Sequence, residues 1–376
     1  MDATMDSRPQ RPADPGTTPP HGLLQPAAAA SGWLDRVDPG THRRIKGLRL
    51  VTAYGIAAAL GTLQDIAHSV PGSVSLGYLA GSFALWASVS EGKTTRAESS
   101  RDLILLSGAA ALGAILFVLL SNPLQLMGRG ASELALVIGA FLVGYLKRFG
   151  VLGAGVGSQI YIGELLAYGT HLTATDLWAI AVATLIAALA SVVPRMLSGP
   201  AERPVIAAAL APLPNPLPGG CSPQFFMGLQ AAIGALAICL LNRLISLEES
   251  AWAITACTYV VAGSATGTIQ RVRRRIIGTL IGVPLGLACL PVAEHAPLLI
   301  WAAAAIAMVI YAMALPERYD IACGAFAFTL IVTLAASGVH SIPLLAARAW
   351  ETLLGGAIGL IAAMCIFPLR SASPDK

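Results

Sequence analysis

Charged residues are scarce in this chain: Asp, Glu, Lys and Arg make up 12% of its 376 residues. Soluble domains carry about a quarter, so this composition excludes an ordinary soluble protein. The sequence also lacks the HExxH spacing of zinc hydrolases, the nucleophile elbow of serine hydrolases and the phosphate-binding loop of nucleotide hydrolases. These absences argue against an enzyme and against ATP-driven transport, and we expect no cofactor.

Histidine and cysteine form no metal-ligand pattern. The six cysteines lie in the second half of the chain, none at metal-ligand spacing from another. The histidines of the expected outer loops and helix ends are isolated from one another in sequence, namely His68, His171, His295 and His340. We predict no metal site, although convergence of these histidines on a metal-binding or pH-sensing site stays open.

Apolar sequence is what the chain has in quantity, with 56% hydrophobic residues and a mean hydropathy of +0.71. A membrane-spanning helix needs about 20 apolar residues. Apolar runs occur in two sets of six: 48–63, 76–90, 103–120, 132–147, 150–169 and 176–194, then 225–245, 251–267, 276–293, 297–314, 321–338 and 344–368. The pattern predicts an all-α polytopic membrane protein with twelve transmembrane helices in the lipid bilayer.

Composition divides the chain into five segments. Residues 1–46 read as a disordered cytoplasmic tail with a basic juxtamembrane end, because the Pro-rich start has no apolar core of a signal peptide. Prolines also rule out a regular helix in the middle segment, which we interpret as a cytoplasmic linker. The remaining boundaries are 47–194 for a first six-helix repeat, 195–224 for the linker, 225–370 for a second repeat and 371–376 for a tail.

Basic residues set the predicted orientation. Arg271, Arg273, Arg274 and Arg275 directly precede an apolar stretch, and guanidinium groups are costly in hydrocarbon, so this basic cluster marks the cytoplasmic surface. With both termini cytoplasmic, all but three of the 24 Lys and Arg lie in tails, in cytoplasmic loops or at their edges. The net charge of +4 therefore reports topology rather than nucleic-acid binding. The cluster could also form an anion-attracting vestibule.

The two halves echo each other in sequence. Shifted by 170 residues, Arg101 falls on Arg271 and Gly108 on Gly278, and in both halves a basic hairpin loop is expected before the third helix. Because each unit has an even number of spans, we predict parallel repeats about an axis along the membrane normal. A substrate site is then expected near the midplane at their interface.

Two stretches resemble a known family. Residues 251–286, with QRVRRRIIGTLIG, and residues 348–370, RAWETLLGGAIGLIAAMCIFPLR, are similar to fusaric-acid-resistance (FUSC-type) and aromatic acid exporter membrane proteins. The resemblance implies a multi-pass protein of the bacterial inner membrane that exports aromatic or other organic acids. It also implies, for many Gram-negative members, a periplasmic adaptor and an outer-membrane channel as partners. Larger relatives carry a cytosolic domain where this chain has only its linker.

Glu164 is the candidate for proton coupling, since a carboxylate within an apolar span is costly enough to suggest a function. Gln159 and Tyr161 precede it in the same run and are candidates for substrate binding. A structural alternative is that Glu164 reaches the outer surface or pairs with Arg348. The two interpretations do not exclude each other.

Arg348 and Glu351 lie three residues apart near the outer end of the last run, so they share a helix face and can pair. Arg348 could instead hold a carboxylate substrate, because guanidinium binds carboxylates with two parallel hydrogen bonds. Gln230 is a further candidate to line a cavity. Glycines at helical spacing are expected to let helices approach closely, namely Gly278, Gly282, Gly286, Gly355 and Gly359.

Three functions remain open on the sequence. A secondary exporter of organic acids driven by the proton gradient fits the duplicated units and the basic face. An organic-anion channel fits the same facts with less need for Glu164. A non-transporting membrane component of an envelope assembly fits the fold alone, and a homo-oligomer is compatible with each of the three.

Overall fold

The structure is a computed structural model, and it describes residues 38–63, 75–92, 95–128, 130–199, 202, 222–247, 250–315, 317–336, 342–366 and 368. The side chains of residues 293, 294, 342–346 and 348 lie outside this described part. Every regular element in it is helical. The α-helices are α2 (His42–Thr62), α4 (Leu76–Ser90), α5 (Arg96–Gln125), α6 (Leu136–Tyr145), α7 (Gly150–Gly169), α8 (Leu177–Leu197), α9 (Pro223–Ile245), α10 (Ser250–Val260), α11 (Ala265–Ala288), α12 (Leu290–His295), α13 (Pro297–Ala314), α14 (Tyr319–Ala336) and α15 (Ile342–Cys365). Short 3₁₀ turns add η1 (Ala131–Ala135), η2 (Leu146–Phe149) and η3 (Ala174–Asp176).

Each predicted apolar run overlaps at least one α-helix, so the all-α prediction is confirmed for the described residues. By length and hydropathy, six stretches of these residues could cross a membrane: Arg96–Gln125, Ala131–Gly169, Ala174–Leu197, Pro223–Ile245, Pro297–Ala314 and Tyr319–Ala336. Helices α2 and α11 fall outside this set because basic residues lie in the N-terminal half of each. Helix α10 is too short, with 11 residues.

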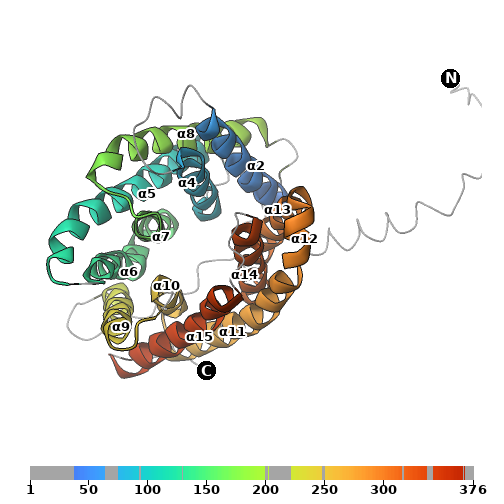
Figure 1. The fold of residues 1–376 in the computed structure, drawn as a ribbon. Helices are drawn as coiled ribbons and strands as arrows, with labels where there is room; N and C mark the ends of the chain where they lie inside the picture. Colours follow the sequence, from blue (N-terminus) through green and yellow to red (C-terminus); the bar gives the residue numbers. More distant parts are fainter. Residues whose placement is uncertain are drawn as a thin grey trace, which may run out of the picture.

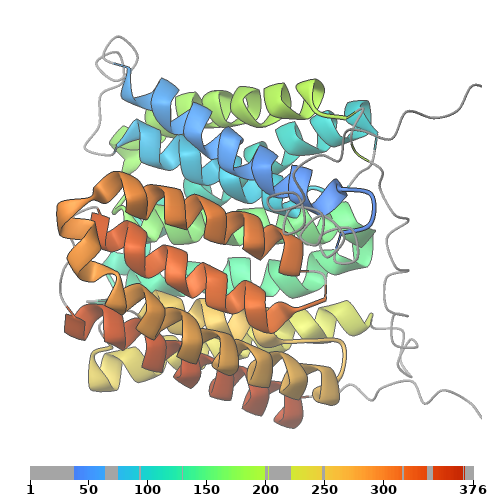
Figure 2. The ribbon, with the colours of Figure 1, turned by 90° about the vertical axis from the view of Figure 1, so that its right-hand side faces the viewer.

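The helices stand side by side in a ring, and α4, α7, α10 and α14 lie nearest its middle (Figure 1). The packing partners of the first half recur in the second. In the first half α2 contacts α4 and α8, α4 contacts α8, α5 contacts α7 and α8, and α6 contacts α7. In the second half α9 contacts α10 and α15, α10 contacts α15, α11 contacts α14 and α15, and α13 contacts α14. Figure 2 shows α13, α14, α11 and α15 as successive layers of this second half. Contacts of α6 with α9 and of α13 with α2 join the halves.

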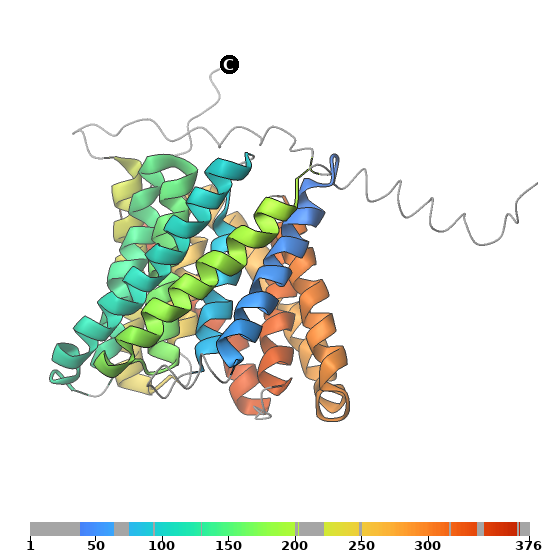
Figure 3. The same ribbon diagram turned by 90° about the horizontal axis from the view of Figure 1, so that it is seen from above.

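A buried ion-pair network closes one end of the first half. Arg49 of α2 bonds to Glu91 at 3.2 Å and to Glu202, both nearly fully buried. Arg195 of α8 bonds to the same two carboxylates, at 3.4 Å to Glu91 and 2.6 Å to Glu202. The start of α2 and the end of α8 therefore lie at the same end of the bundle, as Figure 3 also shows. Since each charge is paired, the network is a structural tie between α2, α4, α8 and the chain that follows α8.

The same end carries a contact between the halves. Arg43, in the first turn of α2, donates a hydrogen bond to the Glu317 carboxylate in the turn between α13 and α14. This hydrogen bond and the positive charge of Arg43 hold the pKa of Glu317 below its usual value. Basic residues of both halves thus collect at one end of the bundle.

Glu133 of η1 ties the halves together at the opposite end. Its buried carboxylate accepts hydrogen bonds from Tyr168 Oη at 2.7 Å, Asn242 Nδ2 at 2.8 Å and Ser250 Oγ at 2.8 Å. These donors come from α7, α9 and α10. A carboxylate with three such donors needs no cation to be accommodated in the interior.

One sequence prediction about the arginine cluster is wrong. The four arginines do not lie in a loop before the helix, because α11 begins at Ala265 and includes them. The side chain of Ser264 accepts a hydrogen bond from the Gly267 amide and caps the helix start. The hydropathy pattern predicted only where the apolar part of the helix begins. The helix itself begins earlier, at the residue that follows its cap.

The glycines of α11 lie at its contact with α14. A Cβ atom on Gly278 would be 2.3 Å from the Asp320 carbonyl oxygen, and one on Gly282 would be 2.2 Å from the Gly324 carbonyl oxygen. Gly355 is as close to α10, where a Cβ would be 2.0 Å from the Ala253 carbonyl oxygen. These positions have no room for a side chain.

The remaining glycines test the predicted repeat register. Gly286 faces Ile331, and Gly359 faces Cys257 and Val260. Gly108, which the shift of 170 residues aligns with Gly278, differs from it in packing, because a Cβ on Gly108 would meet nothing within 4 Å. On α5 the close contact with α7 is at Gly113, where a Cβ would be 1.9 Å from the Ile160 carbonyl oxygen.

Candidate functional site

An aromatic cluster joins the two halves between the inner helices. Phe326 of α14 is its centre, with ring centroids 5.5 Å from Trp86, 6.1 Å from Tyr311 and 6.2 Å from Trp252. Trp86 comes from α4 of the first half, and the other rings come from α13 and α10 of the second. The rings are partly exposed, and their separations are those at which aromatic side chains attract each other.

Arg275 extends from α11 toward this cluster. Its Nη1 donates a hydrogen bond to Tyr319 Oη at 3.4 Å, while its buried Nε has no hydrogen-bond partner among the described residues. Tyr259 and Tyr311 lie within electrostatic range of the same guanidinium. A buried guanidinium N–H without an acceptor is costly, so this group is prepared to receive an anionic oxygen.

Hydroxyl groups between α7 and α10 continue the polar lining. Ser158 Oγ and Tyr259 Oη are hydrogen-bonded at 2.6 Å, and Tyr161 Oη and Thr255 Oγ1 at 2.8 Å. The rings of Tyr161 and Tyr259 meet edge to face, 5.9 Å apart. Of the predicted site residues, Tyr161 therefore lies next to a tyrosine that faces Arg275.

Gln159 is fully buried and connects α7 to α4. Its Nε2 donates to the Trp86 carbonyl oxygen and to Ser90 Oγ, each at 2.8 Å. Its Oε1 has no hydrogen-bond partner among the described residues. Gln159 thus holds the backbone of Trp86, one of the clustered rings, in place.

Glu164 is buried between α7 and α6. Its Oε2 accepts a hydrogen bond from the Gly139 amide at 3.1 Å, and its Oε1 has no hydrogen-bond partner among the described residues. A Cβ on Gly139 would lie 2.1 Å from Oε2, so the glycine leaves room for the carboxylate. With a side-chain exposure of 0%, Glu164 does not reach the surface. The other structural alternative, pairing with Arg348, lies outside the described side chains.

The remaining predicted substrate residues do not converge on this place. Gln230 of α9 donates to the carbonyl oxygen of Ile366, just after α15, at 2.7 Å. Glu351 is buried near the other end of α15. Fifteen residues of helix between Glu351 and Ile366 correspond to about 22 Å, so Gln230 and Glu351 belong to different levels of the bundle. The side chain of Arg348 lies outside the described residues.

Sequence reasoning missed the rings of the cluster. Trp86 and Phe326 are 240 positions apart, and neither stands in a motif. Arg275 was identified as one of the four clustered arginines, but its partly buried position beside the tyrosines was not predicted. The available signal was the helical spacing of the cluster, because four arginines in five consecutive helical positions cannot all face one side.

Residues 235–362 match the family model described as fusaric acid resistance protein-like. The resemblance predicted from the sequence is confirmed over this stretch. No curated protein and no solved structure matches the chain.

The matched stretch contains Arg275 and every aromatic residue of the cluster except Trp86. Glu164 and the other α7 residues lie outside it. Together with the apolar helices, the match supports a multi-pass membrane protein that resembles the fusaric acid resistance family over this stretch.

Proposed function

We propose that this chain is a secondary transporter of the bacterial inner membrane that exports aromatic or other organic acids, driven by the proton gradient. The observation that carries the proposal is the buried Arg275 Nε, which has no acceptor among the described residues and lies beside a cluster of aromatic rings. An aromatic carboxylate has an oxygen that can accept a hydrogen bond from Arg275 and a planar ring that can pack against the cluster.

The chemistry of recognition follows from these groups. Guanidinium binds carboxylate through two parallel N–H···O bonds, and such charge-assisted bonds are roughly twice as strong as neutral ones. Phe326 and Trp86 offer faces and edges to a planar ring. Tyr319, already bonded to Arg275, can turn its hydroxyl toward the same carboxylate. The site therefore favours a small planar acid over a neutral aromatic compound.

The proposed architecture has twelve spans in two parallel six-helix repeats, with both termini and the linker in the cytoplasm. The recurrence of the same helix pairs in both halves supports the repeat. The collection of basic side chains at one end of the bundle supports the orientation. A periplasmic adaptor, an outer-membrane channel and a homo-oligomer belong to the same proposal as partners.

Glu164 is the proposed proton carrier. It lies in the same helix as Tyr161 and Ser158, and its one described hydrogen bond comes from a backbone amide rather than from a cation. A carboxyl group in such a place can gain or lose a proton without breaking an ion pair. Exchange of an outgoing carboxylate for an incoming proton would use both the potential and the pH gradient.

Efflux of a radiolabelled aromatic acid from proteoliposomes under an imposed pH gradient tests the proposal. We expect Arg275→Gln to weaken substrate binding by about tenfold or more, since it removes a charge-assisted pair. Arg101→Gln, an exposed arginine of α5 that contacts Asp102, is the matched control and should behave like the wild type. Unchanged binding in Arg275→Gln with weakened binding in Arg348→Gln would move the carboxylate site to the last helix.

The coupling step has its own variant. Glu164→Gln keeps the shape but cannot titrate, so we expect it to abolish gradient-driven efflux while substrate exchange without a gradient continues. A Glu164→Gln protein that still responds to the pH gradient would contradict the proton-carrier role. An anion channel would then be the better description, because it needs no titrating group.

A further inference from the structure

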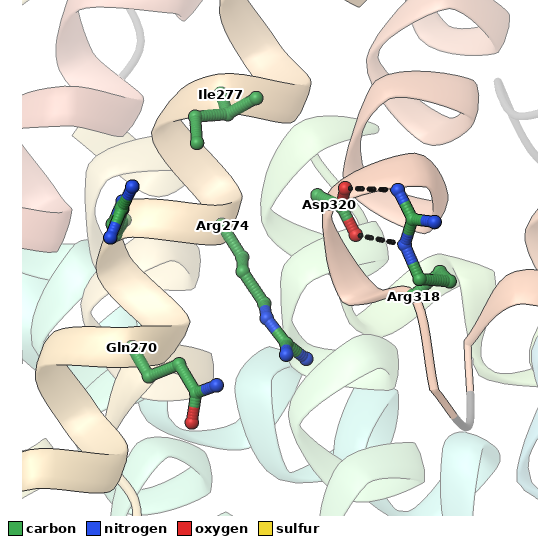
Figure 4. Close-up of a pocket in the computed structure, with 6 residues that line it drawn as sticks. Gln270, Arg274, Ile277, Arg318 and Asp320 are labelled. Atoms are coloured by element: carbon green, nitrogen blue, oxygen red, sulfur yellow. Dashed lines mark hydrogen bonds and ion pairs between the residues drawn. The ribbon is translucent and has the colours of Figure 1, made fainter.

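A pocket lined by basic side chains lies beside α11, separate from the aromatic cluster. A pocket of about 300 Å³ is lined by Gln270, Arg273, Arg274, Ile277, Arg318 and Asp320. The first four have the spacing of one helix stripe; Arg318 directly precedes α14, and Asp320 lies in its first turn. Figure 4 shows Arg274 extending between the two helices, with the Arg318–Asp320 pair on the far side.

The pocket has more positive charge than its acidic group can neutralise. Arg318 bonds to Asp320 with two hydrogen bonds, at 3.0 and 3.2 Å. Arg274 Nη1 donates to the carbonyl oxygen of Glu317 at 3.2 Å, and the Glu317 carboxylate is paired with Arg43. Arg273 has no hydrogen-bond or ion-pair partner among the described residues. Three guanidinium groups thus face one carboxylate.

The pocket lies where a membrane surface is expected. Arg318 directly precedes α14, one of the helices long and apolar enough to span a membrane. On α11 the stripe continues from Ile277 in the pocket to Ile281 and Leu285, and these three side chains are 41%, 57% and 56% exposed. Exposed apolar side chains of this kind contact acyl chains in a bilayer. The arginines of the pocket therefore lie next to an exposed apolar stripe on α11, as the headgroup and the acyl chains of a lipid do.

We propose that this pocket binds the phosphate of an anionic phospholipid of the cytoplasmic leaflet, with its acyl chains along α11. Arg273 and Arg274 would contact the phosphate from one side and Arg318 from the other, and Gln270 would donate to a headgroup hydroxyl. A soluble phosphate would use the same guanidinium groups but would gain nothing from the apolar stripe. The continuity of the stripe with the pocket therefore favours the lipid. This inference stands whether or not the aromatic cluster binds an organic acid.

The test uses the purified full-length protein in detergent. Native mass spectrometry would count bound lipids with phosphatidylglycerol, with phosphatidylcholine of the same acyl chains, and with inorganic phosphate. We expect saturable binding of phosphatidylglycerol that is about tenfold weaker in the double variant Arg273→Gln/Arg274→Gln. The matched control is Arg96→Gln/Arg101→Gln, which removes the same charge from the start of α5 and should bind as the wild type does.

A gain-of-affinity variant guards against a double variant that fails to fold. Asp320→Asn removes the carboxylate that competes for Arg318, so phosphatidylglycerol should bind more tightly, by about threefold or more. Equal binding of phosphatidylglycerol and phosphatidylcholine, or equal losses in the two double variants, would overturn the proposal. Competition by millimolar inorganic phosphate as effective as that by the lipid would also overturn it, since the site would then take a soluble anion.

Discussion

Gly282→Ala should strain the close contact between α11 and α14, because its new Cβ has only backbone to meet. It would lie 2.2 Å from the carbonyl oxygen of Gly324 and 3.0 Å from its Cα. A relaxed carbon–oxygen contact is about 3.3 Å, so α14 must move away by about 1 Å. Overpacking of this size costs about 1–3 kcal/mol. We expect this loss as a lower thermal unfolding temperature of the protein in detergent.

Gly108→Ala is the control that isolates the clash. Both glycines lie within helices, so alanine should gain about 0.5–1 kcal/mol of helix stability at either position. At Gly108 the added Cβ meets nothing within 4 Å. The difference between the two variants therefore measures the α11–α14 contact alone. Equal unfolding temperatures would show that these helices do not approach as closely as described, and Gly282→Leu should enlarge any difference.

Three further predictions concern the two ends of the bundle. Glu133→Gln places an amide among three donors and should cost about 1–3 kcal/mol, measured by thermal unfolding with Arg101→Gln as the reference; a stability equal to the reference would contradict the role of the carboxylate. Arg49→Ala leaves two buried carboxylates with one partner fewer and should cost about 3–5 kcal/mol, seen as a loss of folded protein in membranes. Reporter fusions after Arg203 and after Arg370 should both report cytoplasm, and an external signal at either would exclude the twelve-span topology.

The positions of the helices could be predicted because apolar runs and helices coincide in a membrane protein. Backbone groups in lipid must be bonded within a helix, so each run of sufficient length forms one. The same argument failed at α11, where the eleven residues 265–275 of helix precede the apolar part. It failed there because a helix extends into the aqueous surface wherever its cap allows.

The aromatic cluster could not be predicted, because it depends on how distant helices face each other. Trp86 and Phe326 meet only once α4 and α14 both lie near the middle of the ring. The repeat suggested a site between the halves but did not specify which side chains face it. Arg49 and Glu202 are a similar case, since their pairing joins α2 to the chain beyond α8.

The halves share their helix packing but differ in how their buried charges are satisfied, and this difference separates structural arginines from binding arginines. In the first half, Arg49 shares two buried carboxylates with a second arginine. In the second half, Arg275 keeps an N–H group without an acceptor among the described residues. When one member of a buried ion pair is removed, the partner charge stays buried without compensation. When an incompletely bonded buried charge is removed, the desolvation penalty of that charge is removed together with its few bonds. Arg49→Ala should therefore lower the unfolding temperature strongly, while Arg275→Gln should leave it near the wild-type value and act on binding.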